Sequence, residues 1–117
     1  MMNSKELALT IANMLVDKKA EDVCIIRVDH LTSITDYFVI ATGRNTIAVR
    51  ALAEDVEDRL SEQGIEPRRK EGVNDARWIV VDYASVIVHV LHPEEREYYN
   101  IERLWLDGSN QVPLTEQ

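Results

Sequence analysis

The side chains that could support chemistry in this chain are three histidines, one cysteine and a few acids at predicted strand ends. The candidate metal ligands are His30, His89, His92 and Cys24. His89 and His92 are three residues apart in an extended segment, so a regular strand points them to opposite faces. No carboxylate pair brackets them at ligand spacing. We therefore expect no metal site.

His89 lies within the apolar run 86–91. A histidine there must satisfy its ring nitrogens or have its pKa lowered by desolvation. We expect a neutral structural side chain bonded to backbone or to a carboxylate such as Asp82 on the neighbouring strand, with binding or catalysis as the alternative. Cys24 lies in the apolar run 23–26, where a free thiol acts as a small buried hydrophobe.

The motifs of common enzyme classes are missing from the sequence. Nucleotidyl transfer needs clustered carboxylates that hold two metal ions, and no Asp-x-Asp occurs on a predicted strand. No Gly-x-Ser-x-Gly elbow, Walker loop or dinucleotide fingerprint is present. Gly43 is a lone glycine between a strand and a helix, which predicts a turn, with anion binding at the helix N-terminus as the alternative. We expect no cofactor.

Composition limits the domain count and the class of partner. The chain has 117 residues, 45% of them hydrophobic, enough for one compact domain. Its formal net charge of −8 opposes broad binding to nucleic acid or anionic membranes and favours a basic protein partner. No apolar run approaches the ~20 residues that span a bilayer. The N-terminal segment reads as an amphipathic helix and not as a signal peptide, so we expect a cytoplasmic protein.

Hydrophobic periodicity and turn residues predict eight elements. Asn3 and Glu6 have the spacing of a capping box, and Gly64 suits the end of the second helix. The predicted elements are a helix over 4–18, strands over 23–28 and 37–42, a helix from Asn45 to 63, strands over 65–70, 78–82 and 86–91, and a final helix beginning at Pro93. We expect residues 107–117 to form a flexible tail.

The predicted order, α-β-β-α-β-β-β-α, describes a single α/β domain over 1–106 with a mixed sheet. The gap of three residues between 78–82 and 86–91 requires an antiparallel hairpin. The helical crossover should make strands 37–42 and 65–70 parallel. The strand over 86–91 is apolar at both parities, which predicts cover on both faces.

Late aromatic residues favour binding over catalysis. Trp78, Tyr83, Tyr98, Tyr99 and Trp105 lie in or beside the last hairpin and helix. Large aromatics with a polar handle dominate protein interfaces, although Trp78 and Trp105 could equally pack a core. An acidic rim nearby comprises Glu94, Glu95, Glu97 and Glu102. Such a rim would steer a basic partner.

Three segments together resemble the ribosomal silencing factor family (RsfS), also called Iojap-like. They are SITDYFVIATG at 33–43, RWIVVDY running into VIVHV at 77–90 with Glu71-Gly72 upstream, and REYYNIERLW at 96–105. The similarity extends from about residue 5 to 106 in order. Departures are small: the family often has Gly at Ala84, Phe at Leu91 and Leu at Ile101, and the segment from Asn45 to 49 also differs.

The resemblance implies a fold related to nucleotidyltransferases but without the catalytic acids. It implies a non-enzymatic factor that binds the large ribosomal subunit through ribosomal protein fourteen (uL14), blocks joining of the small subunit and lowers translation when nutrients are scarce. A homodimer in the free state is also implied, with little direct contact to nucleic acid.

The expected partner-binding residues come from all three segments. They are Asp36, Tyr37, Trp78, Asp82, Tyr83, Tyr99, Glu102, Leu104 and Trp105, with Gly43, Gly72 and His89 as structural support. We expect exposed members to contact the partner and buried members to shape the surface. A Glu102→Lys change, if the side chain is exposed, should weaken association without unfolding the domain.

Two other functions compete with this hypothesis. One is a nucleotide-binding or nucleotidyltransferase-like enzyme that uses Asp36, Asp82 and His89 around the Gly43 turn. The other is a scaffold whose main activity is dimerisation.

Overall fold

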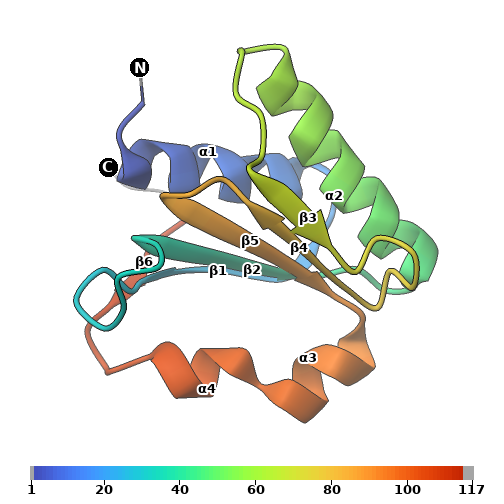
Figure 1. Cartoon of the computed structure of the whole chain (residues 1–117). Coiled ribbons are helices and arrows are strands. Elements are labelled where there is room, and N and C mark those ends of the chain that lie inside the picture. Colours follow the sequence, from blue (N-terminus) through green and yellow to red (C-terminus); the bar gives the residue numbers. More distant parts are fainter. Residues whose placement is uncertain (1, 115–117) are drawn as a thin grey trace.

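The computed structural model describes residues 2–114, which form a six-stranded mixed sheet with helices on both faces (Figure 1). The elements are, in order, α1 (Ser4–Asp17), β1 (Glu21–Arg27), β2 (Tyr37–Thr42), α2 (Thr46–Ser61), β3 (Arg69–Glu71), β4 (Trp78–Asp82), β5 (Val86–Leu91), α3 (Pro93–Tyr99), α4 (Ile101–Trp105) and β6 (Gln111–Val112). The predicted mixed α/β architecture is confirmed. No described helix has both the length and the apolar character that a bilayer crossing requires.

The sheet order is β3-β4-β5-β2-β1-β6. β2 and β5 pair in parallel at the centre, and the β4–β5 hairpin is antiparallel as predicted. β3 pairs antiparallel with β4, so it runs in the same direction as β2, but β4 and β5 lie between them. The predicted parallel direction is therefore correct, although the two strands are not neighbours.

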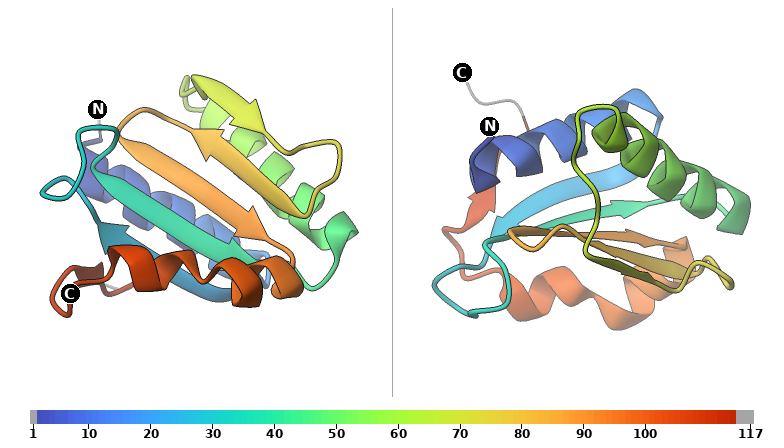
Figure 2. Two further views of the ribbon diagram at one scale, coloured as in Figure 1. Left: turned by 60° about the horizontal axis from the view of Figure 1, so that its bottom comes forward. Right: turned by 45° about the horizontal axis from the view of Figure 1, so that its top comes forward.

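Two apolar layers lie on opposite faces of the sheet (Figure 2). The larger layer packs α1 and α2 against the sheet, and it contains Ile11, Val49 and Val88. The smaller layer lies under α3 and α4, and it contains Phe38 and Ile101. Strand β5 contributes to both layers, which confirms the expected cover on its two faces.

The two long helices begin where their capping residues predict. Asn3 and Glu6 form the capping box, with the Glu6 N–H donating to Asn3 Oδ1 at 2.8 Å. Asn45 Oδ1 accepts the Ala48 N–H at 2.8 Å at the start of α2. Each cap satisfies an N–H that the helix cannot pair internally. Gly64, at a φ of +79°, follows the second helix as expected.

The final helix is two short helices, which the sequence did not predict. α3 ends at Asn100, whose φ of 45° is left-handed, and α4 begins at Ile101. His92 is the N-cap of α3 and Pro93 its first residue. Asparagine tolerates this conformation better than most residues because its short amide can bond locally. We call residues 93–105 the α3–α4 arm.

Two expectations near the chain's later loops are corrected. The strand predicted over 65–70 lies at 69–71, because pairing with β4 decides which residues are extended. The segment after 106 is not an unpacked tail over its described part. β6 adds to the sheet beside β1, with Ile25 opposite Val112. Residues 115–117 of the predicted tail lie outside the described part of the chain.

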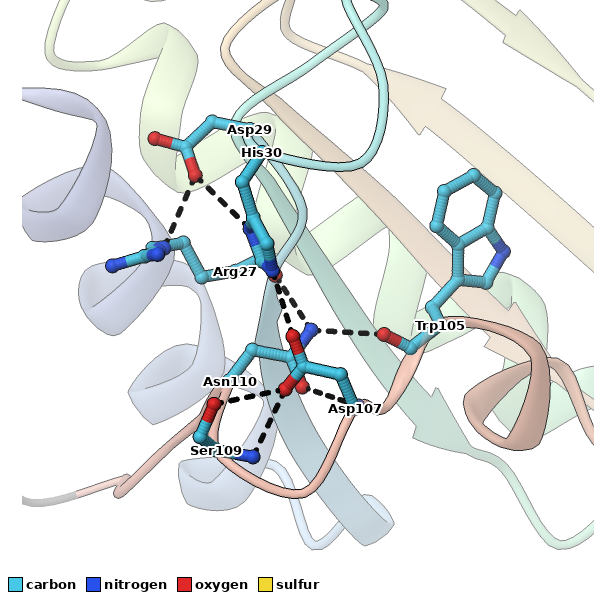
Figure 3. Close-up of polar contacts among 7 residues, drawn as sticks. All are labelled: Arg27, Asp29, His30, Trp105, Asp107, Ser109 and Asn110. Carbon is cyan, nitrogen blue, oxygen red and sulfur yellow. Dashed lines mark hydrogen bonds and ion pairs between the residues drawn. The ribbon is translucent and has the colours of Figure 1, made fainter.

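Asn110 holds this C-terminal segment in place (Figure 3). Its side-chain Nδ2 donates to the carbonyl oxygens of Arg27 and Trp105, both at 2.8 Å, and its Oδ1 accepts the Asp107 N–H. His30 Nε2 lies 2.8 Å from Asp107 Oδ2, which joins the β1–β2 loop to the same segment. This hydrogen bond from His30 lowers the pKa of Asp107 to about 2. This segment has no apolar periodicity in its sequence, and hydrogen bonds hold it in place instead.

Candidate functional site

Six ring-bearing side chains gather where the α3–α4 arm lies on the sheet, and we call them the aromatic cluster. They are Phe38, Trp78, His89, Tyr98, Tyr99 and Trp105. The ring centroids of Trp78 and Tyr99 are 4.9 Å apart, and those of Phe38 and Trp105 are 5.0 Å apart. The Phe38 contacts are edge-to-face, the arrangement that aromatic quadrupoles favour. The cluster thus joins β2, β4 and β5 to both short helices.

His89 is the polar centre of this cluster. Its Nδ1 accepts the Trp78 indole N–H at 3.1 Å. The sequence had suggested a bond to backbone or to Asp82, and that expectation is wrong. Its Nε2 is buried and has no hydrogen-bond partner. Burial lowers the pKa of His89 to about 4. The ring is therefore neutral at physiological pH, as expected, and structural within the cluster.

The outer surface of the arm is apolar and exposed. Tyr98 is 81% exposed and Leu104 is 76% exposed, and about half of Tyr99 is exposed. Trp78 and Trp105 are half-buried, so each belongs to both the packed layer and the surface. Large side chains that stay exposed on a small domain mark interaction sites when they occur together. We call Trp78, Tyr98, Tyr99, Leu104 and Trp105 the arm surface.

Acidic side chains border the arm surface, in part already paired. Arg77, just before β4, donates to Glu95 through Nε and Nη2 at 2.8 and 2.7 Å and to Glu94 through Nη2 at 2.7 Å. These bonds lower the pKa of Glu95 and raise that of Arg77. Glu97 is exposed on the same helix. Three of the four acids predicted for the rim, Glu94, Glu95 and Glu97, lie on this helix, and Arg77 pairs with the first two.

Three of the predicted contact residues lie away from the arm surface. Tyr37 and Tyr83 are buried in the layer beneath α1 and α2, on the opposite face of the sheet. Asp82 is 1% exposed at the far end of β4. Adjacent strand residues point to opposite faces, so Tyr37 cannot share a face with Phe38. These three side chains shape the domain.

Asp82 has a local structural role in the turn before β5. Its Oδ1 accepts the Ala84 N–H at 2.7 Å, and Ala84 has a left-handed φ of 72°. Its Oδ2 lies 3.0 Å from Arg68 and 3.3 Å from Arg69. Burial opposes ionisation, but the Ala84 N–H and the two arginines together hold the pKa of Asp82 below its usual value. The carboxylate therefore fixes the hairpin turn to the edge strand.

Glu102 is also not the free surface charge that the sequence suggested. Its Oε2 accepts from Arg96 Nε at 3.0 Å, and both side chains are largely buried. Asp36 is half-buried at the start of β2, with its backbone N–H bonded to the Ser85 carbonyl. Of the nine expected contact residues, Trp78, Tyr99 and Trp105 belong to the aromatic cluster, and Leu104 is exposed on α4. The site prediction did not include exposed Tyr98 or buried Phe38, which also belong to the cluster.

The residues of the nucleotide-binding alternative are not brought together. Asp36 and Asp82 lie at one end of the sheet, and Gly43 lies at the other, about 20 Å away over the six residues of β2. His89 points into the aromatic cluster. Gly43 makes room for α2, since a Cβ there would lie 2.8 Å from the Val49 nitrogen. The turn therefore serves packing, and it lies apart from Asp36 and Asp82.

One group of potential metal ligands occurs among residues 2–114. His92, Glu94 and Glu95 each place a ligand atom within 4.8 Å of the others. However, His92 Nδ1 already accepts the Glu94 N–H, and Arg77 occupies both carboxylates. A guanidinium thus takes the place that a cation would need. The group works as the cap of α3.

Comparison with known proteins identifies the family. The family model described as "Ribosomal silencing factor during starvation" matches residues 1–117. The chain belongs to the ribosomal silencing factor family. It is 42% identical over 107 residues to "Ribosomal silencing factor RsfS" of Halalkalibacterium halodurans, covering 92% of each chain. It is 40% identical over 107 residues to the Bacillus subtilis protein of that name, covering 92% of this chain and 91% of that protein.

Related structures and an organellar relative extend this result. A crystal structure of a Chromobacterium violaceum protein superposes with a TM-score of 0.86 at 33% identity, covering 98% of both chains. A Bacillus halodurans structure gives a TM-score of 0.80 at 39% identity, covering 95% of this chain and 99% of that one. "Mitochondrial assembly of ribosomal large subunit protein 1" of Mus musculus is 32% identical over 98 residues, covering 81% of this chain and 43% of that protein. The resemblance found in the sequence motifs is confirmed.

Proposed function

We propose that this protein is a non-enzymatic factor that binds the large ribosomal subunit and prevents association with the small subunit. The partner on the large subunit is ribosomal protein fourteen (uL14). Binding lowers translation when nutrients are limiting. The factor acts in the cytoplasm, and a homodimer is its resting form when free. Membership of the ribosomal silencing factor family supports the class of function.

The observation that carries the proposal is the exposed arm surface. Tyr99 lies against Trp78 of β4, and Leu104 is exposed on the next helix. Aromatic residues held by a packed layer lose little conformational entropy on binding, so they make effective contacts. We place the contact with ribosomal protein fourteen on this surface.

The charge of the chain supports a basic partner. The net charge of −8 opposes direct binding to ribosomal RNA but attracts a basic ribosomal protein. Glu97 and the Glu94–Glu95 pair lie beside the apolar contacts. Acidic groups at the edge of an interface accelerate association more than they increase affinity. The arm surface would thus supply the affinity and the rim the direction of approach.

Inhibition follows from occupancy. A domain with principal extents of 34 × 32 × 27 Å prevents the approach of the small subunit wherever its bound position overlaps a bridge between subunits. No chemical step is needed, which agrees with the dispersed positions of Asp36, Asp82 and Gly43. The function therefore requires only a stable fold and a persistent contact.

Sedimentation of purified subunits tests the proposal directly. The protein is mixed with large subunits, small subunits or both at a magnesium concentration that supports joining. We expect it to migrate with the large subunit and to reduce the fraction of joined ribosomes in proportion to its concentration. Normal joining in the presence of saturating protein would contradict the proposal. Light scattering with and without large subunits separates the dimerisation alternative, in which the protein self-associates but does not bind the subunits.

A second measurement tests the choice of partner. The isolated ribosomal protein fourteen is titrated with this protein across a range of salt concentrations. We expect binding whose association rate falls as salt rises, because the acidic rim is screened. Binding to large subunits without binding to the isolated protein would place the contact elsewhere on the particle.

A further inference from the structure

Arg96 occupies a buried position where three elements meet. Its side chain is 11% exposed. Its Nε donates to Glu102 Oε2 at 3.0 Å, its Nη1 to Thr42 Oγ1 at 2.8 Å, and its Nη2 to the Asp22 carbonyl oxygen at 2.8 Å. Nη2 also lies 3.8 Å from the Cys24 sulfur. One guanidinium from α3 therefore contacts α4, β2 and β1.

Two residues near this guanidinium, Asp22 and Asn100, have left-handed backbone conformations. Asp22 has a φ of 49° and lies where the β1–β2 register shifts by a bulge between Glu21 and Cys24. An extra residue in a bulge is left out of the strand ladder, so its carbonyl can accept from a side chain. Asn100 has a φ of 45° and turns the chain so that Glu102 faces back toward Arg96. Such conformations persist only where the surrounding contacts impose them.

The arm has few apolar contacts of its own to fix its orientation. α3 has no buried residue, and α4 has only Ile101. Trp78 contacts Tyr99 of the arm, and Trp105 of the arm contacts Phe38 of the sheet, but ring contacts allow one surface to slide over the other. Directional hydrogen bonds from a planar guanidinium prevent such sliding. The guanidinium contacts of Arg96, together with those of Arg77 to Glu94 and Glu95, therefore set the angle between the arm and the sheet.

We infer that Arg96 is the positioning residue of the arm surface. It fixes the bend at Asn100 and holds the arm against β1 and β2, which sets where Tyr99, Leu104 and Trp105 lie relative to the sheet. Glu102 is the counter-charge that allows the guanidinium to be buried. The contacts above support the orientation of the arm. The role of that orientation in binding rests on the proposed function.

The chemistry of the site makes Arg96→Lys a discriminating substitution. A lysine keeps the charge but presents its donors from a single nitrogen, so it cannot reach three acceptors on three elements. Glu102→Gln keeps the shape of its side chain and removes the counter-charge, which leaves a buried cation uncompensated. Arg103→Lys and Glu97→Gln are matched controls, because both side chains are exposed on the same arm.

Hydrogen exchange of the full chain tests the inference without the ribosome. In Arg96→Lys and in Glu102→Gln we expect amides of residues 94–105 to exchange roughly tenfold faster, with α1 amides as in the wild type. Tryptophan fluorescence gives a second signal, because both tryptophans of the chain, Trp78 and Trp105, lie in the aromatic cluster. Their emission should shift to longer wavelength in the two variants and stay unchanged in the two controls.

The outcomes separate this inference from the proposed function. Arm exchange at the wild-type rate in folded Glu102→Gln or folded Arg96→Lys would overturn the positioning role. Glu102→Gln decides the matter if Arg96→Lys does not fold. Co-sedimentation with large subunits is then measured, where both variants should bind at least about tenfold more weakly than Arg103→Lys. Failure of the wild type to bind would contradict the proposed function and leave the exchange result standing.

Discussion

Trp78 donates its indole N–H to Nδ1 of His89 across the β4–β5 hairpin, at 3.1 Å. An imidazole can accept at Nδ1 only when it is neutral, with its proton on Nε2. That Nε2 is buried without a partner, and burial lowers the pKa of His89 to about 4. The hydrogen bond and the desolvated nitrogen therefore both require the uncharged ring. Protonation would disrupt the contact that joins the hairpin to the aromatic cluster.

The stability of the domain should consequently fall in mild acid. The folded pKa of His89, about 4, lies below its ordinary value of 6.5, so the unfolded chain binds a proton first. Its contribution is complete above pH 6.5 and is lost as the pH falls toward 4. Urea unfolding should give a free energy about 2 kcal/mol lower at pH 5 than at neutral pH from this residue.

A His89→Gln variant isolates this contribution. Glutamine keeps an acceptor for the Trp78 indole and does not titrate, while His30 and His92 remain. The variant should be less stable at neutral pH but show a smaller loss between pH 7 and 5 than the wild type. An equal loss in both proteins would show that the titration of His89 does not govern acid stability.

Leu104→Ser should reduce binding to large subunits without affecting the fold. The side chain is 76% exposed, so its removal should change the free energy of unfolding by less than about 0.5 kcal/mol. An interface residue of this kind contributes roughly 1–2 kcal/mol of binding free energy, or about tenfold in affinity. Ile47→Ser is the matched control, since Ile47 is 75% exposed on α2, across the sheet. Equal effects of the two changes on sedimentation would argue against the arm surface.

The turn before β4 should not tolerate a side chain at Gly72. Its φ is +80°, and a Cβ there would lie 2.0 Å from the Trp78 carbonyl oxygen. Gly72→Ala should lower the free energy of unfolding by about 3 kcal/mol, from strain and backbone displacement together. Gly108 also has a positive φ, but no atom lies within 4 Å of its Cβ position. Gly108→Ala should therefore cost only about 1 kcal/mol, and comparable thermal melts would contradict the steric argument.

Charge reversal should have different consequences at two nearby glutamates. Glu97 is exposed, so Glu97→Lys should leave the thermal melt unchanged and slow association with a basic partner. Glu102 accepts from buried Arg96, so Glu102→Lys should lower the free energy of unfolding by about 2 kcal/mol. Stopped-flow association and thermal melts separate the two effects. The expectation that reversal at Glu102 leaves the fold intact applied to an exposed side chain, and Glu102 is largely buried.

Asn110→Ala should release the C-terminal segment. The side chain satisfies the carbonyls of Arg27 and Trp105, and removing it leaves two acceptors without their partner. We expect a loss of about 2 kcal/mol in the free energy of unfolding. Faster exchange of the Arg27 amide, which donates to the Asn110 carbonyl, would locate the change. Wild-type stability would indicate that water replaces the amide without cost.

The sequence alone determined the elements whose signals are local. Asn3 and Asn45 predicted both long helix starts, because a cap acts within four residues. The strands Tyr37–Thr42, Trp78–Asp82 and Val86–Leu91 were predicted with their observed bounds, since each is a short run made mostly of apolar or β-branched residues. The three linked motifs also determined the family, which the comparisons confirm.

Only the tertiary structure decided which site residues share a surface. Tyr37 and Tyr83 look like contact residues in the motifs, but strand parity turns them into the layer under α1 and α2. Glu102 looks like a free charge until the left-handed turn at Asn100 brings it to Arg96, six residues earlier. The described C-terminal segment lacks an apolar pattern, and the distant carbonyl of Arg27 orders it through Asn110. Contacts between residues far apart in the chain leave no local periodic signal, so they become visible only when the strands are paired.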